Sequence, residues 1–305
     1  MSNFESHESL IYSAPFDVAG GSLSDTIPLT KCSHKVIYDM YDKLMEKFPE
    51  FITKTVLDEA SSCEIRRYTF RNPEQSNPPL KACIIASIHG YEQGAAFVTA
   101  QFFKLMLTSN DKLLSHLKRN VVFDVIPVAN PWGFDHNKRK NENEVDLNRN
   151  FAPYFNGKNE KNSPEHAGEY PESETETKSI IRFLEENSDT QLVLDYHNIA
   201  KGYPLFYVYS QRDVELAKAV FAPLSKKWAK EYPSLPQNES LGRTRPNGHE
   251  GMLADHVIEK GLWVLTMETP WCMPVIGKEQ YDLPTVRCSI DVLANTLLTV
   301  FPQNE

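Results

Sequence analysis

Hydrophobic residues follow two different periods along this chain, and together they predict alternating strands and helices. Short apolar or alternating runs bounded by polar, Pro-rich or Gly-rich segments are typical of β-strands. They occur at residues 63–70, 81–88, 120–128, 191–196, 205–210 and 262–268. Apolar residues that recur with a helical period predict helices at residues 35–48, 93–107, 172–187, 213–232 and 285–301.

The alternation of strands and helices indicates an α/β fold with a largely parallel core sheet. The run KACIIASI, residues 81–88, is apolar on both faces, as strands are when helices cover both sides of a sheet. In sheets of this kind, ligands bind outside the carboxyl ends of the strands. The polar residues that follow each predicted strand are therefore the candidates for a functional site.

Composition narrows the possible functions. The chain has 305 residues, 41% of them hydrophobic and 24% charged, which fits an ordinary globular protein of one large or two small domains. A net charge of −9 argues against nucleic acid as a partner, since phosphate binding needs a basic surface. The sequence shows no signal peptide and no apolar run long enough to cross a bilayer. We therefore expect no membrane partner and a cytoplasmic location.

The cysteine pattern predicts thiols rather than a metal site. The five cysteines are Cys32, Cys63, Cys83, Cys272 and Cys288. No two of them form a C-x-x-C pair, so a zinc site built from cysteines is not expected. An odd number without a signal peptide indicates free thiols in a reducing compartment, where each behaves as a small apolar residue.

Histidine and glutamate side chains follow two of the predicted strands. His89 and Glu92 come after residues 81–88, and His197 comes directly after residues 191–196. Taken alone, Glu92 fits the first turn of a helix and His197 fits a core histidine. If the two strands are parallel, however, all three side chains reach the same edge of the sheet. Two imidazoles and one carboxylate are the ligands of a catalytic zinc site, which keeps a fourth position open for water.

A further candidate, Glu268, stands where the strand predicted at residues 262–268 ends. A carboxylate there has no helix to cap, although an ordinary acidic loop residue is the simple alternative. A zinc hydrolase needs one carboxylate that does not bind the metal, to take a proton from the bound water and pass it to the leaving group. Glu268 is predicted to have this role.

The segment at residues 130–151 also begins at a strand end, and it carries Arg139 and Arg149. Guanidinium groups bind carboxylates in bidentate geometry and can stabilise a developing oxyanion. A solvated basic loop would account for the charge but not for the two asparagines that flank Arg149 in DLNRNF. Asp146 is a candidate to accept the free N–H of a metal-bound histidine.

Together these motifs resemble the zinc carboxypeptidase family of metallopeptidases. HGYE at residues 89–92 matches the family's H-x-x-E motif, and NPWGF at residues 130–134 matches N-P-x-G-F. VDLNRNF at residues 145–151 matches D-x-N-R-N, and TME at residues 266–268 matches the strand that carries the catalytic glutamate. The motifs occur in the family's order, and the resemblance covers residues 35–301.

The resemblance implies a fold and a role for each candidate residue. His89, Glu92 and His197 would hold one Zn²⁺ per chain, and Asp146 would orient His89. Glu268 would be the general base and acid, and Arg139 would stabilise the tetrahedral oxyanion. Asn148 and Arg149 would bind the α-carboxylate of the substrate's last residue. The family's fold is a single α/β domain with a mixed, mostly parallel eight-stranded sheet flanked by helices. We expect residues 35–305 to form this catalytic domain and residues 1–34 to be an extension packed on it.

The function implied is that of a metallocarboxypeptidase, which removes the C-terminal residue of a peptide. The alternative is a zinc amidohydrolase that deacylates N-acyl amino acids, similar to aspartoacylase and succinylglutamate desuccinylase, because these share the D-L-N-R motif. Both substrates end in a free carboxylate. The long interval between His197 and Glu268 and the TMETP context favour the peptidase. A zinc-binding module without catalysis is a third possibility, but it would need neither Glu268 nor Arg139.

The chain also departs from the family's pattern at two places. Tyr91 stands where some members have an arginine between the histidine and the glutamate. Peptide-cleaving members usually carry a mobile tyrosine upstream of the catalytic glutamate, but the corresponding stretch here, GRTRPNGHEG, has none. Arg243, Arg245 or His249 would have to take its place.

The resemblance also bears on the pocket for the side chain of the substrate's last residue. It implies that the segment Gly251–Asp255 lines part of this pocket. Leu253 then predicts an apolar floor, and Asp255 predicts a preference for basic residues.

Overall fold

The computed structural model describes residues 33–303 except 59–61, 76–79, 158–161, 200–202, 229, 231–241, 244–250 and 272–282. Of residues 242, 243, 283 and 284 it describes the backbone alone. The extension expected at residues 1–34 lies outside the described residues except at its last two positions. The second of these, His34, is already part of the first helix.

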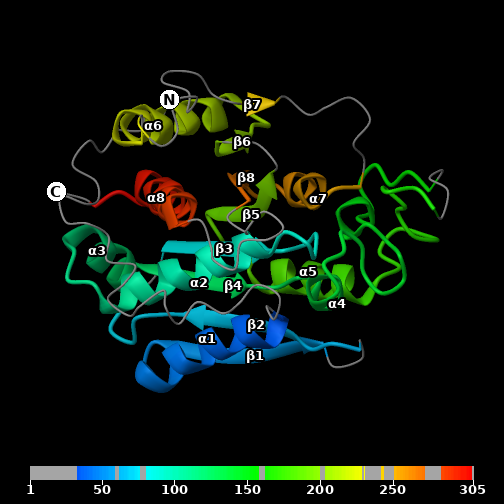
Figure 1. Cartoon of the computed structure of the whole chain (residues 1–305), viewed down its shortest axis with the longest axis horizontal. Coiled ribbons are helices and arrows are strands. Elements are labelled where there is room, and N and C mark those ends of the chain that lie inside the picture. Colours follow the sequence, from blue (N-terminus) through cyan, green and yellow to red (C-terminus); the bar gives the residue numbers. More distant parts are fainter. Residues whose placement is uncertain are drawn as a thin grey trace.

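The central feature is a mixed sheet of eight strands in the order β1-β2-β4-β3-β5-β8-β6-β7 (Figure 1). The strands are β1 Ile52–Asp58, β2 Ile65–Phe70, β3 Leu80–Ala86, β4 Val121–Ile126, β5 Leu192–Ile199, β6 Leu205–Tyr207, β7 Gly242–Arg243 and β8 Val264–Pro270. Strands β4, β3, β5 and β8 run parallel to one another, and β6 pairs with β7 in parallel. The remaining pairs are antiparallel. This confirms the predicted mixed, mostly parallel α/β sheet.

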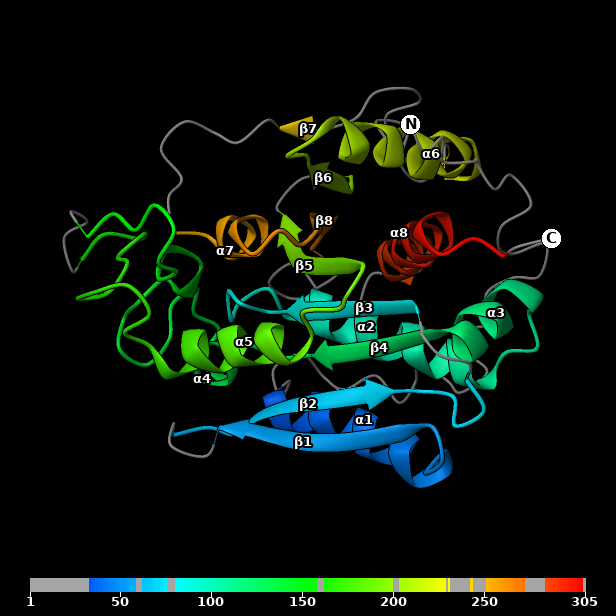
Figure 2. The ribbon, with the colours of Figure 1, turned by 180° about the vertical axis from the view of Figure 1, so that it is seen from behind.

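Helices cover both faces of the sheet (Figures 1 and 2). They are α1 His34–Lys47, α2 Gln93–Thr108, α3 Lys112–Asn120, α4 Pro131–Asp135, α5 Thr175–Glu186, α6 Gln211–Lys227, α7 Leu253–Glu259 and α8 Leu283–Val300, with a short 3₁₀ turn, η3, at Leu147–Arg149. One hydrophobic cluster joins α1, α2, α3, α6 and α8 to the sheet, and a second joins α5 and α7 to it. Alternate residues of β3 belong to the two clusters, so this strand is buried on both faces.

The sequence predicted the central strands better than the peripheral elements. All six predicted strands and all five predicted helices are present, with shifted ends. The edge strands β1 and β7 and the helices α3, α4 and α7 were not predicted. Strand β1 exposes three consecutive side chains, Thr53, Lys54 and Thr55, and so lacks the apolar pattern that marks a buried strand.

Parallel pairing brings the predicted functional segments to one edge of the sheet. The segments that follow β3, β4 and β5 all leave the sheet at its carboxyl edge, where β8 also ends. Backbone N–H groups of Ala129 and Asn130 donate to the carbonyls of Ala86 and Ser87, at 2.9 and 3.2 Å. These bonds fix the loop after β4 against the loop after β3.

Gly90 is required by the close approach of two backbones at this edge. A Cβ atom at position 90 would lie 2.1 Å from the backbone carbon of Gly133 in α4. Next to it, the Tyr91 N–H donates to the Lys138 carbonyl at 2.9 Å. Any other residue at position 90 would therefore push α4 away from the loop that carries His89 and Glu92.

Two further expectations can be compared with the structure. Among the described residues, Cys63, Cys83 and Cys288 form no disulfide, as expected. Cys32 and Cys272 lie outside the described residues. Among the helices of the described segments, none combines the length and the apolar character needed to cross a bilayer.

We expect Gly90→Ala to destabilise the protein by about 1–3 kcal/mol, the usual cost of forcing extra volume into a packed site. It should also weaken metal uptake, because the displaced loop carries two of the predicted ligands. Thermal unfolding of the metal-free protein and a zinc-binding titration measure the two effects.

Gly261→Ala is the matched control. Gly261 has a positive φ of 73°, and a Cβ there would meet nothing within 4 Å. We expect this variant to lose about 1–2 kcal/mol of stability through backbone strain and to bind zinc like the parent. Parent-like stability and zinc binding in Gly90→Ala would show that the loop tolerates the displacement.

Candidate metal and substrate site

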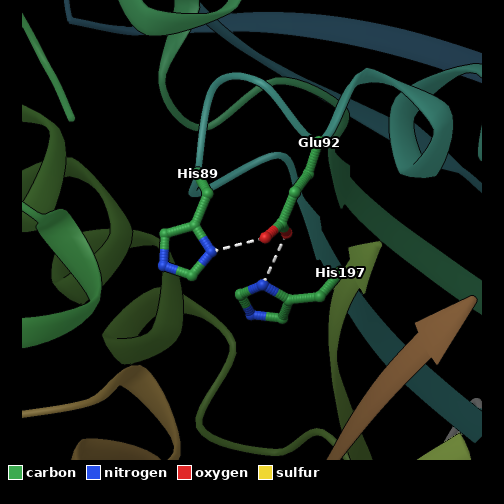
Figure 3. Close-up of side chains that lie close together, drawn as sticks. All are labelled: His89, Glu92 and His197. Atoms are coloured by element: carbon green, nitrogen blue, oxygen red, sulfur yellow. Dashed lines mark hydrogen bonds and ion pairs between the residues drawn. The ribbon is translucent and has the colours of Figure 1, made fainter. Parts of the chain in front are cut away.

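His89, Glu92 and His197 come together at the carboxyl edge of the sheet, as the sequence predicted. Their potential ligand atoms all lie within 4.8 Å of one another, and all three residues are buried. The Nδ1 atoms of His89 and His197 each lie 2.7 Å from an oxygen of Glu92 (Figure 3). The carboxylate thus stands between two imidazoles whose Nδ1 atoms face the same point.

The turn after β3 directs Glu92 toward the histidines rather than toward its own helix. Glu92 occupies the N-cap position of α2, but its side chain makes no capping hydrogen bond. Instead, the Asn198 side chain accepts from the Ala95 N–H at 2.7 Å, and the Asn198 N–H donates to Glu92 Oε2 at 3.2 Å. Because Asn198 caps the helix, the Glu92 carboxylate is available as a ligand.

The charges in this cluster stabilise one another. Burial by itself raises the pKa of Glu92. The two imidazoles lower it by more, so the pKa lies well below its usual range. Burial lowers the pKa of His197, but the carboxylates of Asp195 and Glu92 raise it more strongly, to well above its usual range. A site that attracts positive charge this strongly, with two nitrogens and a carboxylate as donors, fits Zn²⁺.

A carboxylate also lies behind each imidazole. Asp146 Oδ1 is 3.4 Å from His89 Nε2, and Asp195 Oδ1 is 2.8 Å from His197 Nε2. Asp146 was predicted for this place, whereas Asp195 was not. Asp195 stands two positions before His197 on β5, so the alternation of side chains along a strand was the signal that could have identified it.

Asp146 fixes Arg139 beside the candidate metal ligands. Its Nε donates to Asp146 Oδ2 at 2.9 Å, and its Nη2 lies 2.8 Å from the same oxygen. Its Nη1 lies 3.3 Å from His89 Nδ1 and donates to the Tyr91 hydroxyl at 3.4 Å. One nitrogen of the guanidinium is therefore held next to the atom that would bind the metal.

Asn148 and Arg149 lie in η3 and are both buried. The Asn148 side-chain oxygen accepts from the Leu253 N–H at 2.8 Å, which anchors η3 to α7. Arg149 donates to the Asn148 carbonyl and to Glu165 Oε1, both at 2.7 Å. Glu165 was not predicted, because sixteen positions of irregular chain separate it from Arg149.

Glu268 lies directly beside His197, since the two residues are partners in the β5–β8 register. It is buried, and its Oε2 has no hydrogen-bond partner within the described part of the chain. Burial raises the pKa of Glu268, and the nearby Glu92 and Asp195 carboxylates add to this effect, while His197 and Arg139 oppose it. A carboxyl group with this environment is suited to accept and release a proton near neutral pH.

One cavity of about 480 Å³ is lined by all the predicted site residues except Asp146, which is fully buried behind it. Its walls include His89, Glu92, His197, Glu268, Arg139, Asn148 and Arg149, together with Tyr91, Glu165, Asp195, Tyr207, Tyr209, Met252, Thr266 and Trp271. The sequence therefore identified the candidate metal ligands and several of their neighbours but missed much of the cavity wall.

The prediction for the side-chain pocket was wrong in two respects. Leu253 is fully buried in the second hydrophobic cluster, so it is no cavity floor. Asp255 accepts the Met252 N–H at 3.2 Å as a helix cap, and it lines a neighbouring cavity instead. Arg245 and His249 lie outside the described residues, and Arg243 is described only as part of strand β7.

Comparison with known proteins identifies similar sequences and folds. Residues 37–274 match the family described as zinc carboxypeptidase. The chain is 28% identical over 192 residues to mast cell carboxypeptidase A of Homo sapiens, which covers 56% of this chain and 43% of that protein. It is 24% identical over 196 residues to carboxypeptidase A4 of Mus musculus, which covers 57% of this chain and 46% of that protein. The matches thus span less than half the length of these relatives.

The fold resembles a solved structure over most of its length. Bovine thrombin-activatable fibrinolysis inhibitor, solved in complex with tick carboxypeptidase inhibitor, aligns with a TM-score of 0.67 and 21% identity. The alignment covers 90% of this chain and 98% of that one. At this identity, the likeness shows a shared fold.

We expect the purified protein to contain one zinc per chain. His197→Ala should lose most of this zinc, because the variant lacks one of the three ligands and Glu92 loses the imidazole that it contacts. Elemental analysis measures the content. His136→Ala, which removes an exposed histidine outside the cavity, is the control and should keep the metal. If a variant lacking all three ligands bound zinc like the parent, the site would lie elsewhere.

Proposed function

The chain belongs to the zinc carboxypeptidase family, and from this membership we propose that it is a zinc-dependent carboxypeptidase that removes the C-terminal residue of a peptide. The observation that carries the proposal is the position of Glu268 beside His197 in the β5–β8 register. Glu268 is thus a carboxylate with a raised pKa next to a candidate metal ligand, in the cavity that Arg149 also lines.

His89, Glu92 and His197 would hold the zinc. When bound, zinc lowers the pKa of a coordinated water to about 7 and polarises a carbonyl oxygen. Asp146 lies behind the His89 imidazole, and Asp195 lies behind the His197 imidazole. Each carboxylate favours the orientation in which the Nδ1 atom of its histidine would face the metal.

Glu268 is proposed to move the protons of the reaction. Its carboxylate accepts a proton from the attacking water and then delivers it to the amine that leaves. The absence of a hydrogen bond to its Oε2 among the described residues supports this role, because that oxygen is free to exchange protons. Burial favours the protonated form, so the proton can be held until the leaving amine needs it.

Arg139 is proposed to donate a hydrogen bond to the carbonyl oxygen of the scissile bond as negative charge develops there. Asp146 holds two of its nitrogens, which leaves Nη1 beside His89 Nδ1. A donor that is fixed in advance costs little reorganisation when the charge forms. Tyr91 contributes to this placement through its hydroxyl.

Arg149 and Asn148 are proposed to bind the substrate's terminal α-carboxylate. In the structure, one Arg149 nitrogen already binds a carboxylate, that of Glu165 at 2.7 Å. This contact supports the proposal, because the buried guanidinium already donates a hydrogen bond to a carboxylate. A substrate would have to compete with Glu165 for this position.

The other predicted functions have less support. A zinc-binding module would have no use for Glu268 or for the Arg139–Asp146 pair. The deacylase has no support among the comparisons, so its N-acyl amino acid substrate becomes an outcome of the tests below. The cytoplasmic location stays a prediction.

We expect Glu268→Gln to keep its zinc and lose about 10²–10⁴-fold in kcat, the usual contribution of general acid–base catalysis. Turnover of a peptide with a free C-terminus and elemental analysis of the same sample measure the two quantities. Glu259→Gln, an exposed position on α7, is the matched control. A parent-like rate in Glu268→Gln would exclude Glu268 from the mechanism.

The parent should cleave a free-acid peptide at least about tenfold more efficiently than its C-terminal amide, because the amide cannot accept charge-assisted hydrogen bonds from Arg149. Arg149→Ala should lose activity on the free acid and with it most of this preference. Arg119→Ala, exposed on α3, is the control.

The same assay separates a peptidase from a deacylase. Lengthening the substrate on its N-terminal side should leave activity intact or raise it. Activity restricted to short acyl groups would instead identify an amidohydrolase.

A further inference from the structure

The ion pair between Arg149 and Glu165 places a carboxylate of the chain where the proposed function needs a carboxylate of the substrate. Arg149 Nη2 donates to Glu165 Oε1 at 2.7 Å. Both residues line the cavity that Glu268 and the candidate metal ligands also line. In charge and in hydrogen-bonding capacity, the Glu165 carboxylate matches the terminal carboxylate of a peptide. Glu165 and a substrate would therefore bind the same guanidinium.

The position of the Arg149 guanidinium does not depend on Glu165 alone. Its Nη1 donates to the Asn148 carbonyl at 2.7 Å. The Asn148 side chain in turn accepts from the Leu253 N–H at 2.8 Å, which anchors the turn that carries the arginine. The Arg149 side chain is thus held from within the chain on the side away from Glu165. The contact with Glu165 is not required to support it.

The two partners of this pair differ in their access to water. The Glu165 side chain is 41% exposed, whereas the Arg149 side chain is 8% exposed. A half-exposed carboxylate can leave the pair and be hydrated at a modest cost. A buried guanidinium, by contrast, needs an anionic partner to remain stable. Glu165 can therefore leave when another carboxylate takes its place.

Backbone contacts keep Glu165 close to the guanidinium even when the two side chains are apart. The Asp146 N–H donates to the His166 carbonyl at 2.7 Å. The Asn150 side chain donates to the Ala167 carbonyl, also at 2.7 Å. Asp146 and Asn150 lie at the two ends of η3, so the segment that follows Glu165 is tied to the turn that carries the arginine. Rotation of the Glu165 side chain is enough to break the pair and to form it again.

We propose that Glu165 is an internal competitor for the substrate's terminal carboxylate, an autoinhibitory contact that opens when a substrate binds and closes when the released amino acid leaves. This inference rests on the proposed carboxypeptidase function. The apparent affinity of a ligand falls by the fraction of molecules that are competent to bind it, and the closed pair lowers that fraction. Substrate and released amino acid carry the same carboxylate, so Glu165 weakens the binding of both and limits inhibition by the product.

Glu165→Gln tests the proposal, because it keeps the size of the side chain and removes the charge that competes for Arg149. With a free-acid peptide and the zinc-loaded protein, we expect KM to fall by about threefold or more, the scale of a half-exposed ion pair. The inhibition constant of the released amino acid should fall by the same factor. The value of kcat should not rise, because a competitor acts on the bound substrate and the transition state alike.

The matched control is Glu169→Gln, which removes the same charge from an exposed position of the same segment. It should change neither KM nor the inhibition constant. Zinc content and thermal unfolding of both variants show whether each is folded and loaded.

A double variant separates competition for the guanidinium from the general effect of a negative charge in the cavity. In an Arg149→Ala background, Glu165 has no guanidinium to compete for, so Glu165→Gln should leave kcat/KM unchanged. With Arg149 present, the same substitution should raise kcat/KM by about threefold or more. An equal rise in both backgrounds would overturn the proposal, since it would reveal an effect of charge alone.

A role in orienting the guanidinium predicts the opposite result. In that case Glu165→Gln would raise KM for the free-acid peptide and reduce the preference for the free acid over the amide, as Arg149→Ala does. Glu165 would then be a positioning residue, and the proposal would fail. Parent-like values of KM and of the inhibition constant in Glu165→Gln would contradict it as well.

A crystal structure of the zinc-loaded parent with the released amino acid makes the test independent of the variants' folding. The α-carboxylate should bind Arg149 Nη2, and the Glu165 side chain should have turned away into solvent. An intact pair between Arg149 and Glu165 beside the bound amino acid would refute the proposal.

Failure of the carboxypeptidase function is a distinguishable outcome. If the zinc-loaded parent cleaved no peptide, that function would be rejected, and calorimetry with propionate would test Glu165 without any cleavage. Binding that is about threefold or more tighter in Glu165→Gln than in the parent would support the competitor role. Equal binding of propionate by the two proteins would reject that role too.

Discussion

The carboxylate of Glu92 between the imidazoles of His89 and His197 is the interaction on which the rest of the site depends. It joins the turn after β3 to β5 and places both Nδ1 atoms around one point. A buried carboxylate is stable only with such partners. The arrangement also needs Asn198 to cap α2, since Glu92 would otherwise be drawn to the N-terminus of its own helix.

The two cavity arginines are neutralised and oriented by carboxylates of the chain itself, but with different consequences. Asp146 is fully buried, and it holds Arg139 in a fixed place beside the metal ligands. Glu165 is half-exposed, so its hold on Arg149 is open to exchange with a carboxylate from solvent. A fixed donor suits a site of developing charge, and an exchangeable pair suits a binding site.

The sheet, rather than a loop, carries part of the cavity wall. Asp195 and Thr266 belong to two central strands and are held by backbone pairing on both sides. Asp255, which the sequence had favoured for the side-chain pocket, caps α7 instead. A carboxylate on a central strand has little freedom to move, so Asp195 keeps a fixed position behind the His197 imidazole.

The sequence by itself determined the alternation of strands and helices and the residue types at the strand ends. Buried parallel strands need long apolar runs, and polar residues such as His89, His197 and Glu268 interrupt those runs close to the carboxyl ends of the strands. Edge elements such as β1 and α3 escaped prediction because their half-exposed surfaces require few apolar residues. Only the tertiary structure decided that Asn198 caps α2, that Glu165 meets Arg149 and that His197 and Glu268 are neighbours in the β5–β8 register. These contacts join residues far apart in the chain, and they follow from strand order and register, which local sequence does not encode.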